Sequence, residues 1–142
     1  MGLQLTRGGE YAIRGMIYLA GRPAGEVSSL RDIGREQDIP ESFLAKILQS
    51  LVHAGLVASQ RGARGGFTLT RPAAEITTRE IIEAVDGPIS LNICVVRPEE
   101  CHRSPSCRMH RVWVEAQERM MDVLGGVSLA DLAPAPSPAV VS

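Results

Sequence analysis

The three cysteines of this chain lie in one short stretch that ends at His110. Six and five residues separate them, in the pattern Cys94-x6-Cys101-x5-Cys107, and His110 completes a Cys-x-x-His motif. Prolines and charged side chains surround them, with few apolar residues to pack, so burial alone is a poor way to order the stretch. Because a metal centre can order such a loop by tying the thiolates together, the sequence predicts a metal site here.

The spacing of the cysteines bears on which metal centre they hold. Three thiolates with one nitrogen or oxygen ligand suit either zinc or an iron–sulfur cluster. Structural zinc sites usually use tighter cysteine pairs, whereas a two-iron cluster is larger and needs two ligands on each iron, so the wide gaps favour iron–sulfur. A redox switch formed by the thiols without a metal is a further alternative. His110 is preferred to His102 as fourth ligand, because its spacing from Cys107 places both on one face of a starting helix.

The cysteine count and the start of the chain also indicate a compartment. Three is an odd number, and no secretory signal precedes it, so we expect a reducing, cytoplasmic environment rather than a disulfide scaffold. No apolar run approaches the roughly 20 residues that span a bilayer, and no membrane partner is expected. At 142 residues the chain suits one compact domain, or a small domain with an appendage.

The first part of the chain has the periodicity of three helices. One is predicted over residues 8–20, a shorter one begins after Ser29, and the third begins near Pro40. The third helix has two distinct sides. Its apolar stripe contains Phe43, Leu44, Ile47, Leu48, Leu51 and Val52, and its polar side contains Ser42, Lys46, Gln49 and His53.

Two short strands, residues 56–61 and 67–71, are predicted after these helices, with a glycine-rich tip between them. Arg61 and Arg64 project from that tip. Three helices followed by a basic hairpin are typical of a winged helix-turn-helix, whose third helix enters the major groove while the wing reaches phosphates or the minor groove. The predicted DNA-binding residues are Ser42, Lys46, Gln49, Arg61 and Arg64.

The distribution of charge agrees with this interpretation. Residues 1–71 carry nine Lys or Arg and six Asp or Glu, a balance of +3, whereas residues 72–142 carry six and ten, a balance of −4. The first half can therefore face a polyanion, and the second half should not.

Two further helices are predicted, one capped at Thr77 and a longer one from about Pro105 to Leu124. The longer helix has one apolar side. A second copy of the chain is the natural cover for it, since palindromic DNA is bound by two-fold dimers; packing back onto the same chain is the alternative.

We expect a DNA-binding unit at 1–72, a linker helix and cysteine loop at 73–107, a dimerisation helix with a final turn at 108–133, and a disordered tail at 134–142. The expected fold is mainly α with a small β-hairpin. No enzyme motif is found.

Four of these motifs resemble one family of bacterial regulators. They are the start over residues 5–16, the wing over 61–67, the helix over 80–86 and the cysteine triad. Together they are similar to the Rrf2 superfamily of winged-helix regulators, which includes the IscR, NsrR and RirA types, over residues 3 to about 133. The resemblance implies a homodimeric transcription factor, usually a repressor. It also implies a [2Fe-2S] or sometimes a [4Fe-4S] cluster, whose loss, oxidation or nitrosylation changes binding to a palindromic operator in double-stranded DNA.

The resemblance also implies roles for particular residues. Cys94, Cys101 and Cys107 become cluster ligands, while Ser42 and Lys46 contact the groove and Arg61 and Arg64 act from the wing. For the fourth ligand, His110 matches the IscR type, whereas Glu10, offered by the partner subunit, matches the NsrR type. The chain departs from the pattern twice: the first cysteine gap is six where five is commoner, and Arg64 stands where IscR-type wings have glycine. A zinc-stabilised or thiol-redox winged-helix protein is the alternative.

Overall fold

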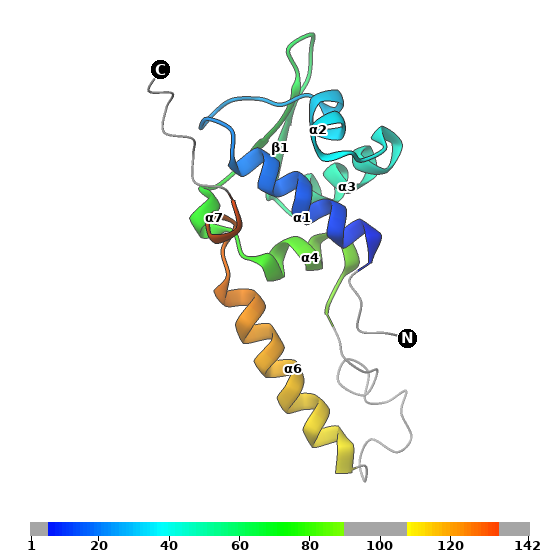
Figure 1. Ribbon diagram of the computed structural model, residues 1–142, viewed down its shortest axis with the longest axis vertical. Coiled ribbons are helices and arrows are strands. Elements are labelled where there is room, and N and C mark those ends of the chain that lie inside the picture. Colours follow the sequence, from blue (N-terminus) through cyan, green and yellow to red (C-terminus); the bar gives the residue numbers. More distant parts are fainter. Residues whose placement is uncertain (1–5, 90–107, 134–142) are drawn as a thin grey trace.

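The computed structural model describes residues 6–89 and 108–133, and its elements follow the predicted order. Figure 1 shows a compact head from which α6 projects as a single rod. The prediction of a mainly helical fold with one antiparallel hairpin is confirmed. The elements are α1 (Arg7–Ala20), α2 (Leu30–Gln37), α3 (Glu41–His53), β1 (Val57–Gln60), β2 (Gly66–Leu69), η1 (Ala73–Glu75), α4 (Thr78–Asp86), α6 (Arg108–Gly126) and α7 (Leu129–Leu132). We call all of these except α6 the head.

Local side-chain caps explain where the later helices begin. At the start of α4, Thr77 and Glu80 form a reciprocal capping box, as the sequence predicts. Ser128 and Asp131 repeat the same arrangement before α7. Each side-chain cap is worth about 1 kcal/mol, so these two starts are encoded within a few residues.

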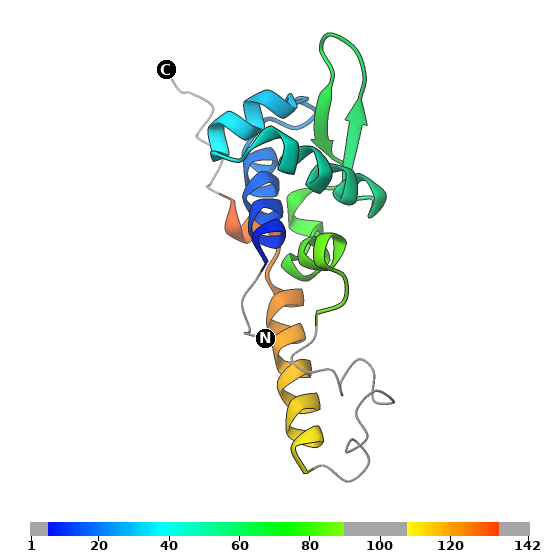
Figure 2. The same ribbon diagram turned by 90° about the vertical axis from the view of Figure 1, so that its right-hand side faces the viewer.

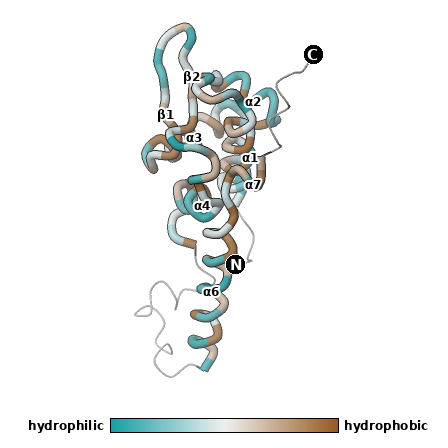
Figure 3. The backbone as a smooth tube through the Cα atoms, turned by 90° about the vertical axis from the view of Figure 1, so that its left-hand side faces the viewer, coloured by the Kyte–Doolittle hydropathy of each residue, from teal (hydrophilic) through white to brown (hydrophobic). Residues whose placement is uncertain are grey.

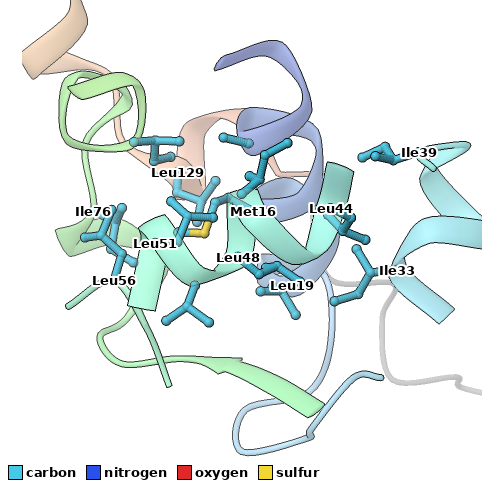
Figure 4. Packing of buried hydrophobic residues seen from close by; sticks show 14 residues of the cluster. Met16, Leu19, Ile33, Ile39, Leu44, Leu48, Leu51, Leu56, Ile76 and Leu129 are labelled. Atoms are coloured by element: carbon cyan, nitrogen blue, oxygen red, sulfur yellow. The ribbon is translucent and has the colours of Figure 1, made fainter. Parts of the chain in front are cut away.

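One aliphatic core holds the head together. Figure 4 shows that side chains from α1, α3 and α7 meet in it. The largest fully buried side chains are Met16, Ile33, Leu44, Leu48, Leu51, Val57, Ile76, Ile81 and Leu129. Because Ile76, Ile81 and Leu129 lie beyond residue 72, the core of the head includes parts of the chain that follow the hairpin.

The segment after α6 returns to the head and is fastened there by backbone hydrogen bonds. The amide of Thr78 donates to the carbonyl of Val127 (2.9 Å), and the amide of Leu129 donates to the carbonyl of Ile76 (2.7 Å). The Thr78 hydroxyl donates to the same Val127 carbonyl at 3.0 Å. The carboxyl end of α6 is therefore joined directly to the start of α4.

Helix α6 packs on α4 of the head; its Met121 is buried, and its Gln117 side chain donates a hydrogen bond to the carbonyl of Ile89. Figure 3 shows apolar and polar residues alternating along the rod. Three apolar side chains on it are exposed: Met109, Val112 and Val123. The helix ends at Gly126, two residues beyond the predicted end at Leu124.

Candidate nucleic-acid interface and metal centre

A three-residue turn joins α2 to α3 and sets the angle between them. Its first residue, Asp38, has left-handed φ (54°), and the amide of Ile39 donates to the carbonyl of Gly34 at 2.9 Å. A Cβ on Gly34 would lie 2.9 Å from the carbonyl oxygen of Ile39, so glycine permits this close approach. Ile39 is itself buried in the core. Two helices joined by so short a turn are the arrangement of a helix-turn-helix motif.

The two sides of α3 have opposite environments. Four leucine and isoleucine side chains face the core: Leu44, Ile47, Leu48 and Leu51. The predicted polar side, which contains Ser42, Lys46, Gln49 and His53, is exposed throughout. The predicted apolar stripe is wrong at Phe43, which is 53% exposed, and Val52 is only half-buried. The exposed side of α3 thus presents both polar side chains and an aromatic ring to solvent.

Glycines shape the tip of the wing and leave its arginines outside. The amide of Gly65 donates to the carbonyl of Gly62 at 2.9 Å, and Gly62 has φ 111°. A Cβ on Gly65 would lie 2.2 Å from the carbonyl oxygen of Gln60, so the tip has no room for a side chain there. Arg61 and Arg64 are both exposed, and neither forms an ion pair within the described parts of the chain. Figure 2 shows the wing at the opposite end of the molecule from the start of α6.

The wing is attached to the helix-turn-helix through a residue that sequence reasoning missed. Ser28 is buried and exchanges two backbone hydrogen bonds with Phe67, of 2.9 and 2.7 Å. A Cβ on Gly66 would lie 2.2 Å from the Ser28 carbonyl oxygen. The neighbouring Ser29 caps α2, so the base of the wing is bonded directly beside the start of α2. The glycine before Phe67 was the one local signal of this close approach.

The candidate metal ligands are only partly within the described residues. Cys94, Cys101 and Cys107 lie outside them. His110 is half-buried in the first turn of α6, and Glu10 is exposed in the first turn of α1. Figures 1 and 2 both place the start of α6 far from α1, so these two side chains of one subunit cannot share a centre. A carboxylate ligand from Glu10 would have to reach the site of a second subunit.

Within residues 6–89 and 108–133, no three potential ligands among the histidines, aspartates and glutamates come together as a metal site. The same described ranges contain no helix long and apolar enough to cross a bilayer.

Comparison with known proteins gives the family. The model of the Rrf2 family, described as iron-dependent transcriptional regulators, matches residues 5–135. The Mycobacterium tuberculosis protein named HTH-type transcriptional regulator Rv1287 is 33% identical over 131 residues, which cover 92% of this chain and 81% of that protein.

Two solved structures have the same fold at 30% sequence identity. CymR, the global cysteine regulator of B. subtilis, has a TM-score of 0.75, with 92% of this chain and 95% of that one covered. IscR of T. potens has a TM-score of 0.70, with 93% and 87% covered. The resemblance found in the sequence motifs is thus confirmed. The chain belongs to the Rrf2 family of transcriptional regulators, which bind DNA and are not enzymes.

Proposed function

We propose that this chain is a homodimeric regulator whose affinity for its operator is set by an iron–sulfur cluster. The observation that carries the proposal is the course of α6. One end of this helix bears His110, three residues after Cys107, and the other end is fastened to the DNA-binding head through Val127 and Leu129. Ligands at one end of a continuous helix can therefore influence the head at the other.

The proposed ligands are Cys94, Cys101, Cys107 and His110, with Glu10 of the partner subunit as the alternative to His110. Thiolates hold iron–sulfur clusters, and imidazole replaces thiolate in some of them, so the donor set fits. When bound, a [2Fe-2S] or [4Fe-4S] cluster supplies a centre that responds to iron supply, oxidation or nitric oxide. The description of the matching family as iron-dependent supports this assignment.

The exposed side of α3 is proposed to enter the major groove with Ser42, Lys46 and Gln49, while Arg61 and Arg64 contact the backbone from the wing. The arginines are exposed and free of ion pairs within the described residues, so phosphate contacts need not break an existing bond.

Dimerisation is proposed to occur along α6. Met109, Val112 and Val123 are 46%, 50% and 65% exposed, which is unusual for apolar side chains on one helix of a single chain. Covering them with the same helix of a second copy gives a two-fold dimer. Its two α3 helices would have to meet half-sites about 34 Å apart, one duplex turn.

Coupling between the two ends follows from the stiffness of α6. Its 19 residues span about 28 Å at 1.5 Å per residue. A small change of angle where residues 107–110 are held becomes a larger displacement at the head. Allosteric coupling of this kind is typically worth about 1–3 kcal/mol, or roughly 5- to 150-fold in affinity.

The test is the composition of protein purified without oxygen. Iron and acid-labile sulfide are expected together with visible absorbance, and Cys101→Ser should remove all three. His110→Ala and Glu10→Gln then separate the two candidate fourth ligands, because only the variant that loses a ligand should release iron faster. Colourless protein that contains zinc, or metal-free protein whose DNA binding follows disulfide formation, would replace this proposal with one of the alternatives.

A further inference from the structure

The aromatic ring of Phe43 lies on the exposed side of α3, although helical periodicity assigns it to the apolar stripe. It is the third residue of the helix and is 53% exposed, whereas its neighbour Leu44 is fully buried. Lys46 follows Phe43 by three positions, and side chains three positions apart on a helix are neighbours. A large apolar side chain therefore stands among the polar residues proposed to contact DNA.

A chain of contacts holds this ring in place. The Tyr11 ring meets it edge-on, with centroids 6.4 Å apart and an interplanar angle of 66°. The Arg14 guanidinium lies over the Tyr11 ring, 5.4 Å from its centroid, and donates a hydrogen bond to the backbone carbonyl of Gln37 at the end of α2. Elements α1 and α2 thus fix a ring at the start of α3 before any ligand binds.

We propose that Phe43 contacts the methyl group of a thymine in the major groove, and so selects one base pair in each half-site. The inference rests on the proposed placement of α3. The first turns of a recognition helix are the part that reaches base edges. Thymine is the base whose major-groove edge carries a methyl group, and phenylalanine is among the side chains that contact it.

Tyr11 and Arg14 act as positioning residues. They do not reach the base themselves, and they restrict the directions that the Phe43 ring can take. An ordered ring loses less conformational freedom on binding than a free one. Replacement of Tyr11 with leucine should therefore weaken the preference for the methyl group, and Tyr11→Phe, which keeps the ring pair, should retain it.

The experiment measures methyl dependence directly. The full-length dimer selects binding sequences from random duplexes, and each thymine of the common sequence is then replaced, in symmetric pairs, with deoxyuridine, which lacks only the methyl group. At one position the parent protein should lose about fourfold in affinity per half-site, the effect of burying one methyl-sized group. Phe43→Ala should bind both duplexes equally, and Phe43→Leu should keep part of the difference.

Lys46→Ala is the matched control on the same side of α3, and it should bind less tightly while keeping the methyl dependence. The inference fails if Phe43→Ala retains the parent's methyl dependence, or if no thymine in the selected sequence shows any. It also fails if Phe43→Ala weakens binding only by dissociating the dimer, as sedimentation would show, because the ring would then belong to a subunit interface. Should the parent select no common sequence, the proposed DNA-binding function itself fails, a result distinct from the others.

Discussion

The backbone amide of Leu129 donates a hydrogen bond of 2.7 Å to the carbonyl oxygen of Ile76, and both side chains are fully buried in the core of the head. Two residues 53 positions apart in the sequence are thus paired at the point where α6 rejoins the head. Helix α7, the last helix of the described residues, is consequently part of the folded head.

Replacement of Leu129 with alanine should lower the free energy of unfolding by about 2–5 kcal/mol, the range for a fully buried leucine. Leu132→Ala, in the same short helix but exposed, is the control, and should cost well under half as much. Urea unfolding of both variants measures the difference. Equal costs would mean that α7 does not contribute to the core.

Replacement of Gly66 with alanine should detach the base of the wing from the start of α2, because a Cβ there would lie 2.2 Å from the Ser28 carbonyl oxygen. Overpacking of this kind costs typically 1–3 kcal/mol. Hydrogen exchange at the amides of Ser28 and Phe67 should accelerate well beyond that of α3. Thr68→Ala, on the same strand, provides the comparison, and unchanged protection in Gly66→Ala would contradict the link.

Replacement of Arg64 with alanine should weaken binding to all duplexes. It should also reduce the slope of log affinity against log salt by about one for each phosphate that the guanidinium neutralises. Arg22 is a suitable control, since it is also a surface arginine but is paired with Glu26 at 2.7 Å. Arg22→Ala should leave the salt slope unchanged. A parental slope in Arg64→Ala would remove the wing from the proposed interface.

Replacement of Val112 with aspartate should dissociate the proposed dimer, since it places a charge on the exposed apolar side of α6. The far-UV circular dichroism should stay close to that of the parent, because Val112 is half exposed in the single chain. Arg111→Asp places an aspartate at the neighbouring exposed position and changes the net charge by two instead of one, so it is the stricter control for added negative charge. Sedimentation equilibrium reports the outcome, and a persistent dimer in Val112→Asp would exclude this face of α6 as the interface.

The parts of the fold that depend on neighbouring residues were predictable from the sequence. The caps at Ser29 and Thr77 specify where α2 and α4 begin, and the glycines between β1 and β2 specify a hairpin. These signals act over a few residues, so they are visible in the sequence without knowledge of the tertiary structure.

What the sequence did not reveal depends on distant contacts. The pairing of Ser28 with Phe67 joins residues 39 positions apart, and the burial of Leu129 depends on how the chain returns after α6. Phe43 has core-like spacing, but the third residue of α3 lies beyond the edge of the core, where Tyr11 meets it only edge-on. The spacing of apolar residues within one helix does not show which of them the neighbouring helices cover.

The most direct test of the account compares one preparation in two states. Protein purified without oxygen is divided, and the iron is removed from one half with a chelator. The affinity of both halves for the selected duplex is then measured at equal protein concentration. We predict a change of roughly 5- to 150-fold, the usual range for allosteric coupling, that is absent in Cys101→Ser. Equal affinity in the two halves, with iron and sulfide verified in the first, would contradict control of DNA binding by the cluster.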